Sequence, residues 1–253
     1  MRVALFVPCY IDQLYPDVGL ATLELLELLD HEVWLPEEVS CCGQPLINTG
    51  TVSAARPLAH GIARILDDSD VLVCPSGSCV ATMRAHATRY GLPRQSFEGR
   101  IFELTEFLLE RLEPKTLRLH FPHRVALHQS CHGLRELGLG QMSELVLSAE
   151  KAHESPARRL LSQVEGLTLV DLERPDECCG FGGSFCVGEP EVSSEMGHSR
   201  IVDFLSADAE VITSVDMSCL MHLSGLLRRS KRALKVMHVA QILAGRTPSA
   251  REN

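Results

Sequence analysis

Eight of the ten cysteines fall into two sets of four that follow the same order along the chain. In each set a lone cysteine comes first, a Cys-Cys-Gly triplet follows, and a fourth cysteine comes last. Four thiolates are the number that holds a four-iron cluster, so the repeat predicts a metal site, with an iron–sulfur cluster as its first interpretation, in each half of the chain. The first set is Cys9, Cys41, Cys42 and Cys79, and the second is Cys131, Cys178, Cys179 and Cys219.

The glycine of each triplet has a predicted structural role. Neighbouring side chains on an extended backbone point to opposite faces, so Cys41 and Cys42 can bind one metal centre only if the chain turns sharply there. Glycine directly after the pair permits such a turn. In the second half, Gly180 is followed by Phe-Gly-Gly, a loop whose amide groups are candidates for hydrogen bonds to cluster sulfurs.

Zinc is the main alternative to iron, because four thiolates in a tetrahedral array bind it well. Zinc ribbons, however, usually draw their ligands from two short Cys-x-x-Cys pairs, whereas these cysteines come from distant segments. A third interpretation is a thiol–disulfide reductase that uses the vicinal cysteines. The two remaining cysteines have no counterparts in the repeat: Cys74 fits a buried free thiol, and Cys186 is open between a fifth ligand, a reactive thiol and no role.

One acidic residue distinguishes the two halves. Asp216 stands three residues before Cys219, where Ser76 stands before Cys79, so the two sites are expected to differ in ligation or in potential. The favoured role of Asp216 is a helix N-cap or an acidic residue in the first turn of a helix.

Two histidines, His128 and His132, flank Cys131. Both are close enough in the chain to donate a hydrogen bond to a cluster sulfur or to move protons, and a neutral supporting role is the favoured interpretation. Arg135 is a candidate either to attract a carboxylate substrate or to cover a helix face. The residues alone do not assign a catalytic group.

The elements that must position these cysteines alternate between strands and helices. Strands are expected at residues 2–8, 33–35, 71–73, 125–127, 167–170 and 211–213, and helices at residues 18–29 and 50–66. This alternation predicts an α/β fold in two duplicated halves, each a mostly parallel sheet with flanking helices and a metal site at the carboxyl ends of the strands. A proline-containing connector separates a first cysteine-rich domain, residues 1–115, from a second, residues 124–248.

Composition excludes several classes of function. The net charge is −9, with 24 basic and 33 acidic side chains and no basic stripe, so nucleic acid is not an expected partner. No segment approaches the roughly 20 apolar residues that span a bilayer, and no signal peptide is apparent, which predicts a cytoplasmic protein. Thiols stay reduced there, which favours metal ligation over disulfides. The segment after the first strand lacks the glycines of a dinucleotide-binding turn.

Four segments resemble the cysteine-rich domain family that occurs in the B subunit of heterodisulfide reductase, in the iron–sulfur subunit of glycolate oxidase and in the lactate utilization protein A family, the last being the most similar. The similarity runs from residue 1 to about residue 245. The segments are Cys41-Cys-Gly-Gln-Pro45, Pro75-Ser-Gly-Ser-Cys79, His128-Gln-Ser-Cys-His-Gly-Leu-Arg-Glu-Leu137 and Glu177-Cys-Cys-Gly-Phe-Gly-Gly183.

The resemblance implies an oxidoreductase subunit that transfers electrons in a three-protein cytosolic system oxidising L-lactate to pyruvate. The implied partners are a ferredoxin-like iron–sulfur subunit and a third small subunit. Together with the thiol count, the resemblance predicts one or two [4Fe-4S] clusters per chain. Zinc in one half stays the alternative that the four-thiolate sets leave open. In the reductase relatives five cysteines hold each noncubane cluster, and this sequence has Ser76 and Asp216 where the fifth would stand. The alternative function is a non-catalytic scaffold subunit of the same complex, in which the metal or cluster only stabilises the fold.

Overall fold

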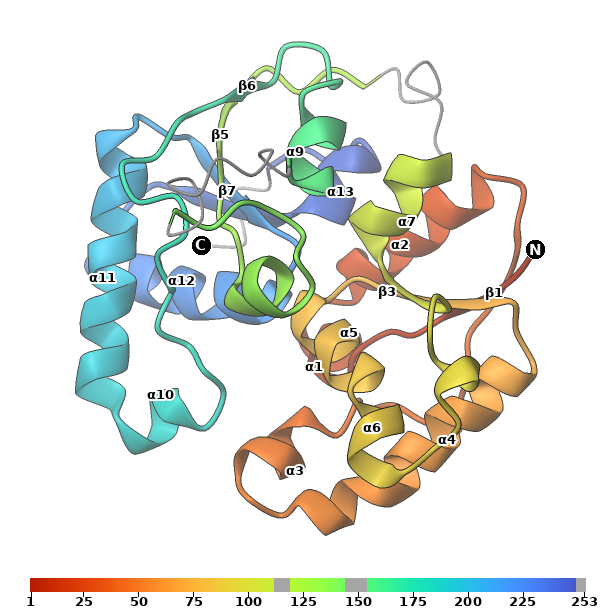
Figure 1. Ribbon diagram of the computed structural model, residues 1–253. Helices are drawn as coiled ribbons and strands as arrows, with labels where there is room; N and C mark the ends of the chain where they lie inside the picture. The colour runs from red at the N-terminus through yellow and green to blue at the C-terminus, as the bar shows by residue number, and fades with distance from the viewer. Residues whose placement is uncertain (112–118, 144–153, 249–253) are drawn as a thin grey trace.

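The computed structural model describes residues 1–111, 119–143 and 154–248, which form two four-stranded parallel sheets (Figure 1). The first sheet has the order β2-β1-β3-β4 and the second the order β6-β5-β7-β8, so each half repeats one topology. The strands are β1 (Arg2–Leu5), β2 (Glu32–Trp34), β3 (Val71–Cys74), β4 (Ile101–Glu103), β5 (Arg124–Leu127), β6 (Thr168–Leu169), β7 (Val211–Ser214) and β8 (Lys235–His238). The α/β prediction with two duplicated halves is confirmed.

One of the two central strands of each sheet has the same sequence as its counterpart in the other sheet. Both β1 and β5 read Arg-Val-Ala-Leu, with an exposed arginine followed by three buried residues, as expected for strands covered on both faces. The register also repeats, because Val3 pairs with Val71 and Val125 pairs with Val211. The loops that follow equivalent strands therefore begin at equivalent positions on the carboxyl edge of each sheet.

Helices connect the strands and cover the sheets. Those of the first half are α1 (Cys9–Leu14), α2 (Pro16–Glu27), α3 (Gln44–Asn48), α4 (Arg56–Asp67), α5 (Gly77–Arg84), α6 (His86–Tyr90) and α7 (Leu104–Arg111), with short 3-10 turns η1 (Val52–Ala55) and η2 (Arg94–Ser96). Those of the second half are the π-helical turn η3 (His132–Glu136), α9 (Pro156–Leu161), α10 (Phe185–Gly188), α11 (Pro190–Ser206), α12 (Met217–Ser230) and α13 (Val239–Leu243). Within the described ranges, no helix is long and apolar enough to cross a membrane.

Two elements differ most from their predicted boundaries. The strand expected over residues 2–8 ends at Leu5, because Pro8 has no amide hydrogen to donate and Cys9 already begins α1. The helix expected from residue 50 begins at Arg56, where a proline occupies its first turn, a place in which a missing amide hydrogen costs nothing.

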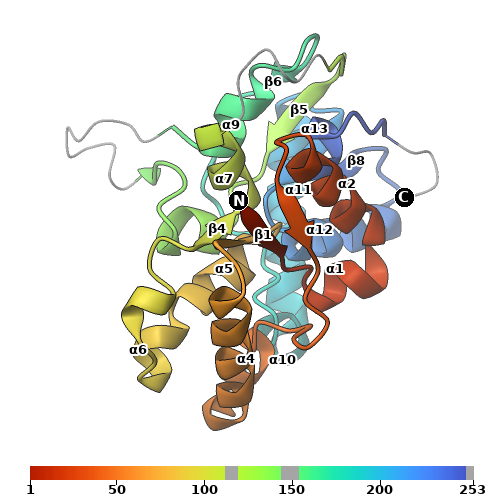
Figure 2. The same cartoon turned by 90° about the vertical axis from the view of Figure 1, so that its right-hand side faces the viewer.

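Four helices lie between the two sheets and join them. Helix α2 packs against α13 and α7 packs against α9, so each pair takes one helix from each half (Figures 1 and 2). One hydrophobic core runs through this layer and includes Phe107 and Leu108 from the first half and Leu161 and Leu243 from the second. The halves therefore share a core. Their division at residues 1–115 and 124–248 stays a prediction, since residues 112–118 of the connector lie outside the described residues.

A buried carboxylate holds the halves together at the carboxyl edges of the sheets. Ser76 and Asp216 form an isolated antiparallel bridge between the segments that follow β3 and β7. One oxygen of Asp216 accepts the amide hydrogen of Ser218 and the hydroxyl hydrogen of Tyr10, at 3.3 and 3.1 Å, and the other accepts the amide hydrogen of Ser78 at 2.7 Å. The predicted N-cap role is confirmed, and it extends to both α12 and the first turn of α5.

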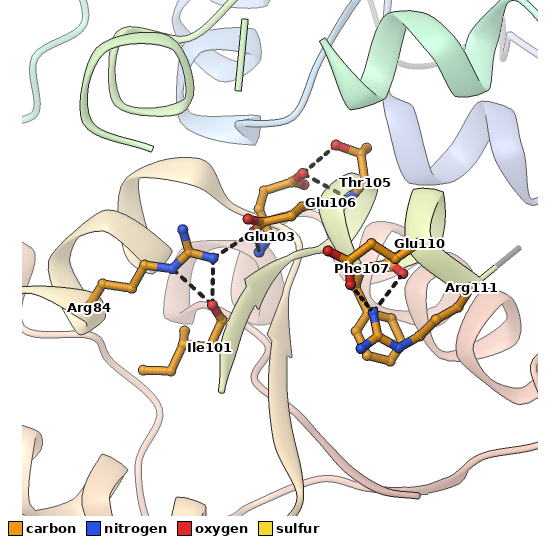
Figure 3. A network of polar contacts seen from close by, with 8 residues as sticks. All are labelled: Arg84, Ile101, Glu103, Thr105, Glu106, Phe107, Glu110 and Arg111. Carbon is orange, nitrogen blue, oxygen red and sulfur yellow. Dashed lines mark hydrogen bonds and ion pairs between the residues drawn. The ribbon is translucent and has the colours of Figure 1, made fainter. Parts of the chain in front are cut away.

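The last strand of each sheet ends in a residue whose side chain caps the next helix. Glu103, at the end of β4, is fully buried, and one of its carboxylate oxygens accepts from the amide and the hydroxyl of Thr105 (Figure 3). His238 takes the same place after β8, where its Nδ1 accepts the amide hydrogen of Ala240 at 3.1 Å. Burial raises the pKa of Glu103 to about 8, so this carboxyl group holds a proton at neutral pH.

The raised pKa of Glu103 makes stability depend on pH. Between the ordinary value of 4.5 and the folded value of about 8, only the folded state holds the proton, so the free energy of unfolding falls as the pH rises, by up to about 1.4 kcal/mol per unit. Glu103→Gln keeps an acceptor oxygen for Thr105 and cannot ionise. We expect its stability relative to the unaltered protein to grow from pH 5 to pH 8, measured by urea unfolding. The control is Glu106→Gln, which alters the partly exposed partner of Arg84 and should keep the dependence of unfolding free energy on pH. If Glu103→Gln and the unaltered protein showed the same dependence on pH, the raised pKa of Glu103 would be contradicted.

Removing the shared cap should loosen the junction between the halves. Asp216→Ala deletes the acceptor for two helix N-termini and for the Tyr10 hydroxyl, and we expect it to lower the free energy of unfolding by about 2–4 kcal/mol. Ser218→Ala removes only one hydroxyl donor to the same carboxylate and should cost less than about 1 kcal/mol. Urea unfolding measures both, and similar losses in the two variants would show that the carboxylate does not join the halves.

Candidate metal centres

The four cysteines of the first set converge at the carboxyl edge of the first sheet. Cys9 follows β1, Cys41 and Cys42 follow β2, and Cys79 is the third residue of α5. The Cys9 thiol donates to Cys41, and the Cys42 thiol contacts both Cys41, to which it donates, and Cys79. The structure thus brings together four residues that are distant in the sequence.

The second set has the same arrangement. Cys131 follows β5, Cys178 and Cys179 follow β6, and Cys219 is the third residue of α12. The chain of thiol contacts again runs from the lone cysteine to the first and then the second cysteine of the pair, and ends at the fourth. Burial repeats as well: in each set the lone cysteine and the first of the pair are half-buried, while the other two are buried.

The first cysteine of each pair has a strongly lowered pKa. Hydrogen bonds from Cys42 and Cys9 lower the pKa of Cys41 to about 2, and hydrogen bonds from Cys131 and Cys179 lower the pKa of Cys178 to about 2. The donating neighbours have pKa values raised by the same contacts and by burial. Since metal ligands must be deprotonated, each set holds a preformed thiolate at its centre and would release the remaining thiol protons on binding a metal.

A left-handed glycine makes each vicinal pair possible. Gly43 has φ +88° and Gly180 has φ +87°, and their amide groups donate to Cys41 Sγ and Cys178 Sγ at 3.4 Å. A side chain at residue 180 would also lie 2.5 Å from the carbonyl oxygen of Ser193. The turn predicted from the triplets is therefore present in both halves, and its amide group supplies a hydrogen bond to sulfur.

The fourth cysteine of each set lies in the first turn of a helix. Cys79 and Cys219 both occupy the third position, and Ser76 Oγ accepts the amide hydrogen of Cys79 at 3.3 Å. The positive end of the helix dipole favours thiolate over thiol at these positions. Both helix N-termini meet at the Asp216 carboxylate, so the two sites lie on either side of the same junction.

A cavity of about 420 Å³ lies between the halves and contacts both cysteine sets. Gln44 of the first half and His132 of the second meet in its wall, where Gln44 Nε2 and His132 Nε2 lie at hydrogen-bond distance, 3.0 Å apart. The cysteines that line it are Cys9 of the first set and Cys131, Cys178, Cys179 and Cys219 of the second. Its walls also include the glycine loop after the second triplet, which reaches towards Asn48 of α3.

The remaining cysteines lie beside the two sets. Cys74 is fully buried at the end of β3, as a free thiol was expected to be, and it contacts the Cys79 thiol. Cys186 lies on α10, where its thiol donates to the carbonyl oxygen of Gly183 at 3.0 Å. Arg135 lies 3.8 Å from a carboxylate oxygen of Asp176, an arrangement that does not require a substrate carboxylate.

One contact of the second set was partly anticipated by the sequence. A ring nitrogen of His128 and the sulfurs of Cys179 and Cys219 all lie within 4.8 Å of one another. Burial and then the charge of Arg200 lower the pKa of His128 to about 3, so the ring is neutral. The position of His128 before Cys131 indicated this histidine, whereas nothing in the spacing indicated Arg200, which comes from α11.

The donor sets fit an iron–sulfur cluster. Each offers four convergent thiols, a backbone amide hydrogen directed at one sulfur and a helix N-terminus, and thiolate is the ligand that such clusters take. Cluster sulfurs and thiolates both carry negative charge, which these donors stabilise. The residues that would hold a cluster are the eight cysteines of the repeat.

Comparisons with known proteins agree with this arrangement. A sequence model of the cysteine-rich domain, CCG, matches residues 3–84 and again residues 125–224. The chain is 39% identical over 250 residues to lactate utilization protein A of Exiguobacterium sp., covering 96% of both chains. It is 36% identical to lactate utilization protein A of Geobacillus kaustophilus, covering 97% of this chain and 100% of the relative.

Among solved structures, an Asp/Glu racemase of Yersinia pestis aligns over 97% of this chain and 96% of its own, at a TM-score of 0.37 and 12% identity. That likeness is too low to bear on function. Two matches to the cysteine-rich domain, and identities of 39% and 36% over nearly the whole chain, show the family. The chain belongs to the lactate utilization protein A family of cysteine-rich domain proteins.

Proposed function

We propose that this chain is the iron–sulfur electron-transfer subunit of a multi-protein system that oxidises L-lactate to pyruvate. The observation that carries the proposal is the pair of four-thiol sets, alike in contacts and burial, that meet at one cavity. The names of the relatives support the lactate part. The proposed partners are a ferredoxin-like iron–sulfur subunit and a third small subunit, and the proposed location is the cytoplasm.

The cysteines of each set differ in burial, and this difference would decide which side of a bound metal group is accessible. In each set the two buried cysteines anchor the site against the core, and the two half-buried cysteines leave one side accessible. When bound, an iron–sulfur cluster accepts and releases single electrons. The amide groups of Gly43 and Gly180 and the N-termini of α5 and α12 stabilise the added negative charge.

Oxidation of lactate to pyruvate removes two electrons and two protons from the substrate, so an electron-transfer subunit would carry the electrons away one at a time. We assign no catalytic residue on this chain. The carbon chemistry would then belong to another subunit, and the proposed role of this one is conduction between that subunit and an acceptor.

A second candidate is a scaffold subunit with a structural zinc ion in the second half. It is favoured by the compact group of His128, Cys179 and Cys219, whose ligand atoms lie within 4.8 Å of one another, a spacing suited to a single ion. In this case the metal would stabilise the fold and no electrons would pass through it.

Metal content separates the two functions. The protein purified without oxygen should contain about eight iron and eight acid-labile sulfide per chain if both sets hold four-iron clusters. Cys178→Ala should lower the iron content to about four per chain, because it removes the central thiolate of the second set, and should abolish electron transfer in the reconstituted lactate oxidation system. Iron and sulfide analysis and electron paramagnetic resonance measure the first effect, and acceptor reduction measures the second.

Cys186→Ala is the matched control, since this thiol lies in the same half and its hydrogen bond goes to a backbone carbonyl oxygen, that of Gly183, instead of to another thiol of the described residues. It should keep the full iron content and activity. A colourless protein that contains zinc alone and still supports lactate oxidation would contradict the electron-transfer role. Loss of complex assembly in Cys178→Ala, checked by size-exclusion chromatography, would instead indicate the scaffold.

A further inference from the structure

The two halves differ at the first residue after the strand sequence that they share. After the repeated Arg-Val-Ala-Leu sequence, the first half has Phe6 and the second has His128. Both side chains are buried, and His128 lies beside Cys179 and Cys219. The first half thus has an apolar ring where the second has a group that can form hydrogen bonds.

A buried ion pair fixes the orientation of His128. Arg200 and Asp203 of α11 form a salt bridge with side chains 0% and 1% exposed. Arg200 also donates from Nη1 to the carbonyl oxygen of Arg174 at 2.6 Å and from Nε to His128 Nδ1 at 3.3 Å. Removing a charged pair from water is costly, so this arrangement in the core calls for a specific role.

The direction of these bonds determines where His128 carries its proton. A guanidinium group only donates, so Nδ1 of His128 must accept, and the proton of the neutral ring lies on Nε2. His128 Nε2 is buried and has no hydrogen-bond partner among the described residues. A buried N–H group without an acceptor is uncommon and indicates a partner that the protein side chains do not supply.

The first half offers no equivalent donor at Phe6. The buried histidine of that half, His86, directs its Nε2 to the carbonyl oxygen of Cys42 at 2.9 Å rather than to a sulfur. Both sites have the glycine amide and the helix N-terminus in common. His128 is therefore one difference between two sites that have these other donors in common.

We propose that Asp203 and Arg200 position His128 so that its Nε2–H donates to a sulfur of the metal group in the second site only, which makes that site the stronger electron acceptor of the two. This inference rests on the proposed electron-transfer function. A hydrogen bond to sulfur stabilises the reduced state, which carries one more negative charge, and so raises the reduction potential. Within one chain, an electron at the first site would then pass to the second, with no bond made or broken.

The test is a potentiometric titration of both sites, followed by electron paramagnetic resonance, in the protein and its variants. The second-site signal is identified as the one missing from Cys178→Ala. In the unaltered protein the second site should have the higher potential. His128→Phe, which copies the first half, should lower that potential towards the value of the first site, and His128→Gln, which retains an N–H group, should restore part of the shift. The first-site potential is the internal control and should not move.

A measurement on the unaltered protein avoids any effect of the variants on folding. With histidine labelled with ¹⁵N, pulsed resonance at the second site should show one weakly coupled nitrogen, as expected for a hydrogen bond rather than a metal–nitrogen bond. A strongly coupled nitrogen would make His128 a ligand and overturn the inference, as would an unchanged second-site potential in His128→Phe. Absence of iron from the second set would instead overturn the proposed function.

Discussion

The buried carboxylate of Asp216 is the contact on which the arrangement of the two sites depends. It accepts hydrogen bonds from the first turns of α12 and α5, and those turns carry Cys219 and Cys79. An acidic group in this place is stabilised by two helix dipoles as well as by its hydrogen bonds. Because both helix N-termini meet at this group, the carboxyl edges of the two sheets face each other, and the two sets of thiols lie at one junction instead of on opposite ends of the molecule.

The grouping of the cysteines and the fold class could be predicted from the sequence, because the two halves repeat the same order of residues and elements. The repeat separated eight cysteines from Cys74 and Cys186, and the structure brings those eight together as two sets. Glycine after each pair was sufficient to predict the turn, since few other residues adopt its conformation. The fold class followed from alternating strands and helices, which have different hydrophobic periods.

The parts that sequence reasoning missed depend on contacts between distant segments. Arg200 reads as an ordinary surface residue in a helix, and only the fold places it against His128, 72 residues earlier. The packing of α2 on α13 and of α7 on α9 has no local pattern either, because amphipathic helices do not specify which partner they cover. Strand β1 was predicted to extend to Pro8, because the apolar composition continues to that residue. In the structure the strand ends at Leu5, since its end depends on pairing with a neighbouring strand.

The helix layer between the sheets has a consequence for how the protein is made. Helix α13, at residues 239–243, packs on α2, at residues 16–27, so this apolar face of α2 stays exposed during synthesis until residues 239–243 have left the ribosome. During that interval the thiols of the first set have formed no joint cavity with the second. Delivery of a metal would therefore compete with oxidation of exposed thiols in a partly folded chain, and the rate at which α13 docks would set the length of that exposure.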